Sequence, residues 1–323
     1  HPGVMFDLLN EPHDRVETDP YPMWRPDGTQ YPQDHRRVSA EDWKPWAELL
    51  IDTIRTEAPE TPLFVSGTNW GYDLRGLPVD RDRLYAIAKK HGLRGVEDAA
   101  QSYGSTWQGR NIGAFGDFVS FSFHPNKNVT SIEGGALVLN DEREATLAEQ
   151  YRLQGVIRSG MDGMEVEIVG GKFNLTDVAA RVGLGQLDRL AEFNARRHAL
   201  ARRYFAAFAA AGAEKLGLGL PPANFTDTNW HMFQVMLPEP RLKVPRAVVM
   251  EELKAAGIGS QVHYPAIHRF KLYRKLGWKD GDFPHAEYAG RNILTIPLFP
   301  AMADTDVDRV VGTLMTLLKR SLK

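Results

Sequence analysis

The sequence contains no cysteine, which excludes disulfide bonds, thiolate metal sites and a cysteine nucleophile and suits a reducing compartment. It also lacks an apolar run of the roughly 20 residues that a membrane-spanning helix needs. No charged and then apolar leader stands at its start, and its first residue is His1 rather than methionine. We therefore expect a cytoplasmic protein with no membrane segment, whose natural beginning has been removed.

A strong charge of either sign is also absent. The 39 basic and 41 acidic side chains give a formal net charge of -2, so the sequence has no electrostatic signature for nucleic acid and favours small-molecule partners. With 323 residues, of which 43% are hydrophobic, the chain is long enough for two compact domains. No internal repeat is visible.

The apolar and glycine patterns predict an α/β protein with a smaller second domain. Helices are expected where apolar residues recur at helical spacing, and strands where short apolar runs lie between turns. The expected strands are 4–9, 63–65, 93–96, 118–123, 136–139, 232–237 and 260–264, and the expected helices are 39–58, 82–92, 141–155, 176–211, 245–256 and 304–322.

The stretch 96–139 combines polar side chains with strand-like runs. Asp98 follows one predicted strand and Gln101 comes three residues later, whereas Ser122 lies near the end of the next strand and Lys127 follows in the loop. Ionisable groups at the ends of buried strands are typical of cofactor sites. This set would meet the needs of pyridoxal phosphate, which are a lysine for the Schiff base, a carboxylate for the pyridine nitrogen, a ring contact and a phosphate donor.

The sequences EDAAQ and GDFVSFSFHPNKNVTSIEGG within this stretch resemble the DegT/StrS-type family of sugar aminotransferases. The resemblance continues through GKFNLTD, QL, FNARRHALARRY, VHYPAIH and NILTIPLFP, and covers about residues 80–323. It implies that Lys127 is the Schiff-base lysine and proton shuttle, Asp98 the pyridinium partner, Gln101 a ring contact and Ser122 a phosphate ligand. It further implies that Asn174 contacts the cofactor phosphate across a homodimer interface.

The same resemblance implies a partial fold type I transferase, with a large cofactor-binding domain over 81–190 and a connecting helix and small α+β domain over 191–323. A nucleotide-linked keto-sugar is the implied substrate, and glutamate is the implied amino donor. His263 and Tyr264 of the HYPAIH sequence are candidates for substrate contacts, while an ordinary loop stays open as the alternative.

Simpler interpretations exist for single residues. A lone lysine is usually a solvated surface group, and an isolated aspartate is more often a helix cap. The joint spacing of Asp98, Gln101, Ser122 and Lys127 argues against both. His263 and His268 are only weak candidates for a metal pair, because no third ligand stands near them and zinc sites need three or four. We therefore predict no metal.

Residues 1–80 resemble a different family. The sequence DLLNEP, followed by WAELLIDTIRTEAP and LFVSGTNWGYDLRG, is similar to glycoside hydrolase family 5, a cellulase-like family of (β/α)8 barrels. That resemblance makes Glu11 the acid/base and Asn10 a sugar contact, at the carboxyl end of a barrel strand. The second carboxylate, needed about 5 Å away for retaining hydrolysis, has no counterpart here. Only two of the eight barrel strands are recognisable.

The aminotransferase is also incomplete. No part of residues 1–80 matches the family's phosphate-binding turn and ring-stacking aromatic, and the Ser66-Gly67-Thr68 sequence lies in the cellulase-like part, too close to Asp98 to replace them. The sequence therefore predicts a join of two families near 77–82. We predict a sugar aminotransferase of reduced or no activity, with a cellulase-like glycosidase and a non-catalytic chimera as alternatives.

Overall fold

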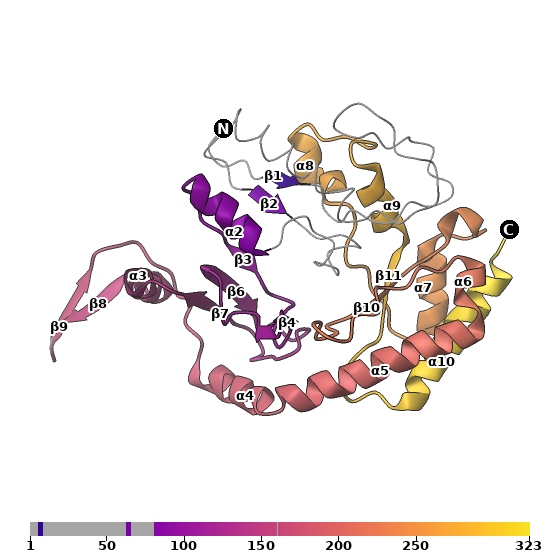
Figure 1. Ribbon diagram of the computed structural model, residues 1–323, viewed down its shortest axis with the longest axis horizontal. Coiled ribbons are helices and arrows are strands. Elements are labelled where there is room, and N and C mark those ends of the chain that lie inside the picture. Colours follow the sequence, from indigo (N-terminus) through magenta and orange to yellow (C-terminus); the bar gives the residue numbers. More distant parts are fainter. Residues whose placement is uncertain (1–5, 9–62, 66–80, 160) are drawn as a thin grey trace.

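The computed structural model describes residues 6–8, 63–65, 81–159 and 161–323, which are drawn as coloured ribbon in Figure 1. In the first eighty residues it describes two strands, β1 (Phe6–Leu8) and β2 (Leu63–Val65). They pair in parallel with Phe6 opposite Leu63, which confirms these two predicted strands. The helix predicted over 39–58 lies outside the described residues, and so do Asn10, Glu11 and Ser66-Gly67-Thr68.

A three-stranded sheet forms the centre of the next part of the chain. It has the order β3-β6-β7, with β3 (Glu97–Asp98) parallel to β6 (Phe118–Ser122) and β7 (Gly135–Leu139) antiparallel to β6. Val119 and Phe121 alternate as buried residues of β6 and pack with Ala99. The helix before β3 is α2 (Arg81–Lys90).

The strand predicted over 93–96 is wrong, because the strand in this region is β3 and begins only at Glu97. The pairing with β6 starts only at Glu97, and the side chain of Val96 is 56% exposed, so the apolar run that suggested a strand does not enter the sheet. Asp98 is consequently the last residue of β3 itself rather than a residue that follows the strand.

Beyond the sheet, α3 (Glu142–Arg152) begins at Asp141, whose carboxylate accepts the Glu144 N–H as an N-cap. Two hairpins were not predicted, because their strands are too short to show a period: β4 (Thr106–Trp107) with β5 (Arg110–Asn111), and β8 (Val156–Ser159) with β9 (Gly163–Val166).

The single long helix predicted over 176–211 is two helices, α4 (Asp177–Leu187) and α5 (Leu190–Ala211). Arg189 leaves helical geometry with φ -105° and ψ 5°, and its ion pair with Glu192 lies at the start of α5. Helical periodicity continues across this break, so the sequence pattern could not reveal it. Helix α5 ends at Gly212, whose φ of 76° favours glycine.

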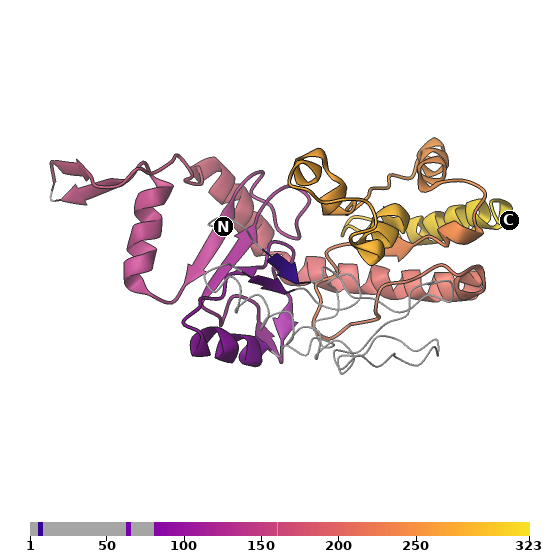
Figure 2. The same ribbon diagram turned by 90° about the horizontal axis from the view of Figure 1, so that it is seen from above.

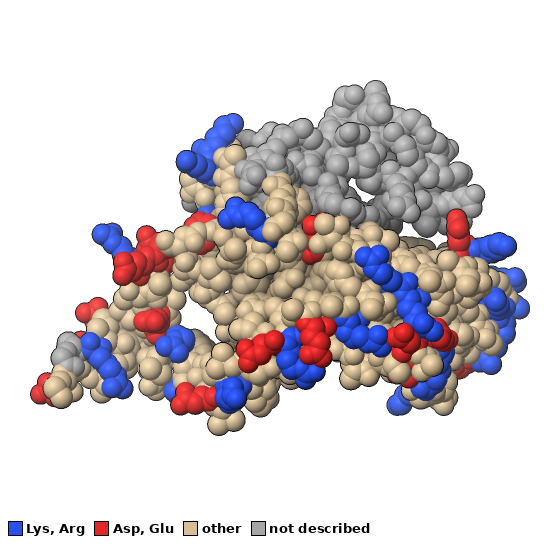
Figure 3. Space-filling model, turned by 60° about the horizontal axis from the view of Figure 1, so that its bottom comes forward, with Lys and Arg blue, Asp and Glu red and all other residues tan. Residues whose placement is uncertain are grey.

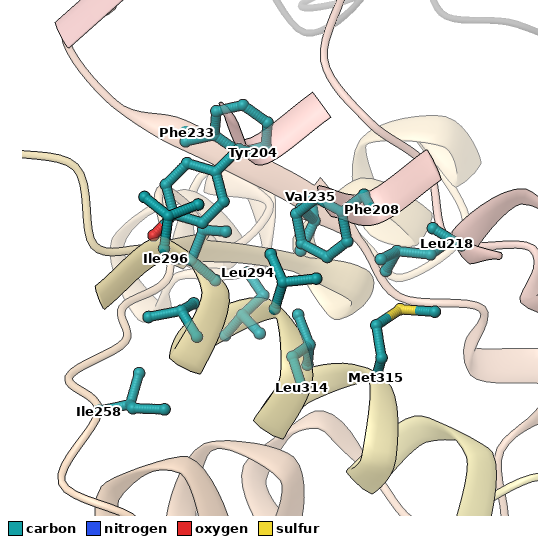
Figure 4. Close-up of a cluster of buried hydrophobic side chains, with 14 of the residues drawn as sticks. Tyr204, Phe208, Leu218, Phe233, Val235, Ile258, Leu294, Ile296, Leu314 and Met315 are labelled. Carbon is teal, nitrogen blue, oxygen red and sulfur yellow. The ribbon is translucent and has the colours of Figure 1, made fainter. Parts of the chain in front are cut away.

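The C-terminal part is built on two antiparallel strands, β10 (Phe233–Met236) and β11 (Ile293–Ile296), with Phe233 opposite Ile296. Helices α5 and α10 (Asp304–Arg320) pack beside each other near these strands (Figures 1 and 4). The remaining helices here are α6 (Ala213–Leu216), α7 (Arg246–Ala255), α8 (Lys271–Lys275) and α9 (Pro284–Asn292), with 3-10 turns η2 (Glu239–Arg241) and η3 (Ile267–Arg269).

The main hydrophobic core lies in this part. Leu200, Tyr204 and Phe208 recur at every fourth residue of α5 and are completely buried, as are Leu314 and Leu318 of α10. Figure 4 shows the side chains of α5, α10 and both strands converging. Each such buried side chain contributes about 1.5–3 kcal/mol relative to an exposed one, so this core anchors the long helix that leads back to the β3-β6-β7 sheet.

The strand predicted over 260–264 is wrong. It is reduced to a single bridge between Gln261 and Thr295 of β11, and the chain bends at His263. By contrast, the strand expected over 232–237 and the helices expected over 245–256 and 304–322 are confirmed within one or two residues.

Figures 1 and 2 show α5 extending from beside the sheet β3-β6-β7 to the part of the chain with the β10–β11 pair, so the two groups of strands lie at different positions along the molecule. Lys and Arg side chains alternate with Asp and Glu on the face shown in Figure 3, in agreement with the near-zero net charge. In the residues that the structure describes, no helix combines the length and the hydrophobicity needed to cross a membrane.

Candidate cofactor site

Two of the predicted site residues lie at one edge of the sheet. Asp98 ends β3 and Ser122 ends β6, and because these strands are parallel their carboxyl ends face the same way. The Asp98 carboxylate is exposed, and its Oδ1 accepts the Ala100 N–H at 3.0 Å. The Ser122 hydroxyl accepts the His124 N–H at 3.3 Å, which leaves its own proton for donation.

Lys127 lies in the turn that follows β6, where its N–H donates to the His124 carbonyl at 2.9 Å. The positive charge of its ammonium group acts on two imidazoles and helps to lower the pKa of both His231 and His263. Burial is the larger cause in each case, and all the causes together lower the pKa of His231 to about 3. Both rings are therefore neutral at pH 7, and the single positive charge in this group of three is that of Lys127.

Gln101 lies in the turn after β3 and is half-buried. Its main-chain carbonyl accepts the Asn229 side-chain amide at 2.8 Å, so the turn is held by the C-terminal part of the chain. Asn128, directly after Lys127, is buried and bonds to the same part through His231 and the carbonyl of Asn229. Two loops that the sequence places 26 residues apart thus share one anchoring segment.

The HYPAIH sequence reaches the same region. The His263 ring bonds to the Thr295 hydroxyl at 2.8 Å, and the main-chain carbonyl of His263 accepts the Gln234 side-chain amide at 2.7 Å. The Tyr264 ring lies edge-on to that of His263, with centroids 4.9 Å apart, and is exposed. His263 thus lies within the electrostatic influence of Lys127, with Tyr264 beside it.

His268 lies elsewhere. It is buried against Glu287, with Nε2 2.9 Å from Oε1, and does not pair with His263. Within the described ranges, no group of three or more His, Asp and Glu side chains is arranged to bind a metal ion.

Asn174 lies apart from Lys127 along the chain, and its amide reaches the carbonyl of Leu175 at 3.5 Å. The Leu175 side chain lies over Gly134, where an added Cβ would come within 2.8 Å of it. The segment that carries Asn174 therefore packs against the turn before β7.

The donor set fits pyridoxal phosphate. A carboxylate and a hydroxyl end neighbouring parallel strands, and a half-buried lysine follows in the next turn. These are the groups that the pyridine nitrogen, the phosphate and the aldehyde carbon require. The two neutral imidazoles add no positive charge beside the lysine.

Comparisons with known proteins agree with this chemistry. The model of the DegT/DnrJ/EryC1/StrS aminotransferase family matches residues 71–315. The match covers most of the chain, which therefore belongs to this family. A second model, cellulase (glycosyl hydrolase family 5), matches residues 1–91. Both predicted resemblances are confirmed.

Solved structures share the fold. The putative sugar aminotransferase Spr1654 from Streptococcus pneumoniae, in its PMP form, is 28% identical, with 76% of this chain and 68% of that chain covered and a TM-score of 0.67. DesV from S. venezuelae, in complex with a ketimine intermediate, is 34% identical, with 76% and 64% covered and a TM-score of 0.65. PseC from Helicobacter pylori is 22% identical, with 87% of this chain and 79% of that chain covered and a TM-score of 0.70. This likeness shows the fold alone.

The family and these structures, among them a PLP form of Spr1654, confirm the predicted enzyme class, an aminotransferase with pyridoxal phosphate as its cofactor. They also confirm the aminotransferase fold, whereas the barrel fragment and the domain boundaries stay predictions. Asn128, Asn229 and His231 were not found from the sequence. No local pattern marks them, because Asn128 and His231 are separated by 103 residues.

Proposed function

We propose that this chain transfers an amino group from glutamate to a nucleotide-linked keto-sugar. The observation that carries the proposal is the placement of Lys127 beside the sheet edge formed by Asp98 and Ser122, in a member of an aminotransferase family. The names of the sugar aminotransferase Spr1654 and of DesI, described in the presence of its TDP-sugar product, support the substrate class.

The proposal gives each of these side chains a role. The bound cofactor supplies an electron sink that stabilises negative charge on the substrate carbon. Lys127 would hold it and would move the proton at the reacting carbon, while Asp98 would keep the pyridine nitrogen protonated. Ser122 donates its free hydroxyl proton to the phosphate, and Gln101 contacts the ring.

His263 and Tyr264 are proposed to face the substrate. The neutral His263 ring lies near Lys127, and Tyr264 is exposed beside it, so both can contact a molecule that approaches the lysine. A neutral imidazole and a phenol can each donate and accept hydrogen bonds, which suits the hydroxyl groups of a sugar.

We further propose a homodimer in which Asn174 reaches the partner's cofactor phosphate. An exposed apolar surface around this residue supports the arrangement. The side chains of Val169, Phe173 and Val178 are 94%, 76% and 74% exposed, which is costly for apolar groups unless a partner covers them.

The test of the lysine is direct. Addition of pyridoxal phosphate to the full chain is expected to give the visible absorption band of lysine-bound cofactor, and Lys127→Ala is expected to lose it. Lys90→Ala, which removes an exposed lysine at the end of α2, serves as the control. Equal spectra for wild type and Lys127→Ala would contradict the assignment.

The two alternatives remain predictions with their own tests. A glycosidase that uses Glu11 and Asn10 would release reducing sugar from β-glucans and lose this activity in Glu11→Gln. The cellulase match to residues 1–91 favours testing it. A non-catalytic chimera would lose pyridoxal phosphate on gel filtration, whereas an aminotransferase retains it.

A further inference from the structure

The segment Thr228–His231 contacts both loops of the cofactor site. The Asn229 side-chain amide donates to the carbonyls of Gln101 at 2.8 Å and Tyr103 at 3.0 Å, and the Asn229 N–H donates to the Ser105 hydroxyl at 3.1 Å. Asn229 is 3% exposed, so these bonds are shielded from water. The turn after β3 is thus fixed to this segment by three hydrogen bonds.

The loop of Lys127 is fixed to the same segment through Asn128. The Asn128 Nδ2 lies 3.1 Å from the Asn229 carbonyl and 3.2 Å from Asn194 Oδ1. A main-chain carbonyl can only accept, so the nitrogen of the amide must face it and the oxygen must face His231. His231 Nδ1, 2.8 Å from that oxygen, is therefore the donor.

The protonation state of His231 follows from its surroundings. Burial, together with the nearby charges of Lys127, Arg197 and His263, lowers its pKa to about 3. A ring that is neutral and carries its proton on Nδ1 keeps a bare Nε2, which can accept a hydrogen bond but adds no charge beside Lys127.

The main chain of His231 is also held. The buried Arg197 guanidinium donates to the carbonyls of His231 at 2.9 Å and Trp230 at 3.3 Å, and the His231 N–H donates to Asn229 Oδ1 at 3.0 Å. The ring therefore projects from a fixed backbone, so its bond to Asn128 can set the position of the loop.

We propose that His231 is a positioning residue for Lys127. Its neutral Nδ1–H form holds the Asn128 amide, and so fixes the Lys127 loop against the same segment that fixes the Gln101 turn. The two loops keep their separation because both bind one short segment. The inference rests on the proposed role of Lys127 in binding the cofactor.

The experiment compares wild type, His231→Phe and His231→Asn in the full chain. His231→Phe keeps a ring but removes the donor, so buried Asn128 loses a partner and the affinity for pyridoxal phosphate is expected to fall by about 5- to 30-fold. His231→Asn offers an amide N–H near the position of Nδ1 and is expected to recover most of that affinity.

Two measurements on cofactor-free protein test the arrangement without activity. Amide hydrogen exchange over residues 99–105 and 124–131 is expected to be faster in His231→Phe than in wild type. Nitrogen NMR of the His231 ring is expected to show the Nδ1–H form. It should show no further protonation between pH 5 and pH 8, because the pKa of about 3 lies well below this range.

His198→Ala is the matched control, because the His198 ring bonds to the Thr228 carbonyl at 2.7 Å but to neither loop. An equal loss of affinity in His198→Ala and His231→Phe would overturn the proposal, and so would an Nε2–H ring or unchanged exchange in His231→Phe. Failure of the Lys127→Ala test would instead overturn the function and the positioning role together, while exchange and NMR would still report the hydrogen bonds.

Discussion

The buried pair His268 and Glu287 joins the η3 turn to α9, with Nε2 2.9 Å from Oε1. Glu287 also accepts the Gly281 N–H and lies 3.6 Å from Arg291. Burial acts to raise the pKa of Glu287, but the hydrogen bonds from Gly281 and His268 outweigh it, so this pKa lies below its ordinary value of 4.5. The carboxylate therefore stabilises the fold in its ionised form.

We expect Glu287→Gln to lower the free energy of unfolding at pH 7 by about 1–3 kcal/mol, because it removes a charged acceptor from buried donors. A lowered carboxyl pKa contributes stability that is present above the unfolded-state value and is lost as the pH falls through the folded-state value. Below about pH 4.5 the difference between wild type and variant should therefore narrow. Urea denaturation of wild type and variant at pH 7 and below about pH 4.5 measures this difference in the free energy of unfolding.

The exposed Glu251→Gln on α7 is the control for this experiment, since it removes the same charge without a buried partner. A constant difference between wild type and Glu287→Gln from pH 7 to about pH 3.5 would show that the charge of Glu287 does not stabilise the fold.

The β6–β7 pair is the element that connects stability to the cofactor site. Gly135 of β7 lies opposite Ser122, and a Cβ added to it would come within 2.5 Å of the Phe121 carbonyl oxygen. Because that neighbour is backbone in the middle of a sheet, the clash can be relieved only if the strands move apart.

Gly135→Ala is therefore expected to lower the free energy of unfolding by about 1–3 kcal/mol and to weaken the binding of pyridoxal phosphate through displacement of Ser122. Thermal unfolding and cofactor titration measure the two effects. Gly185→Ala in α4 is the control, because no atom lies within 4 Å of its added Cβ and a helical alanine should gain roughly 0.5–1 kcal/mol. Equal affinity for pyridoxal phosphate in Gly135→Ala and Gly185→Ala would show that the β6–β7 pairing does not affect the cofactor site.

At the scale of the whole molecule, one group of exposed apolar side chains lies at the end opposite to the main core. Figure 1 places α4 and the β8–β9 hairpin away from α7 and α10. The most exposed apolar residues of this end are Met161, Met164, Val166, Val169, Phe173 and Val178. A second copy of the chain would cover them, in keeping with the proposed role of Asn174.

We expect light scattering after gel filtration to give the mass of a dimer for wild type and of a monomer for Val169→Asp/Val178→Asp. The carboxylates would be buried without partners in the dimer, which costs several kcal/mol. The monomer should also bind pyridoxal phosphate more weakly, since it lacks the partner's Asn174. Leu276→Asp, at the exposed end of α8, should leave the dimer intact. A monomeric wild type would remove Asn174 from the site.

Features that depend on neighbours along the chain could be predicted from the sequence. Helical and strand periodicity placed α2, β6, β7, α3, β10, α7 and α10, since apolar spacing reports which face of an element is buried. The candidate site residues of 98–127 could be proposed for a similar reason, because their spacing within one continuous stretch carries the family resemblance.

Features that depend on contacts between distant segments could be seen only in the folded chain. The break between α4 and α5 keeps helical periodicity. Residues 260–264 pair with β11 at one bridge only, and β3 starts at the residue where its pairing with β6 begins. The joint anchoring of Lys127 and Gln101 by Asn229 and His231 belongs to the same class. These hydrogen bonds span more than 100 residues, and a contact at that separation leaves no local pattern in a single sequence.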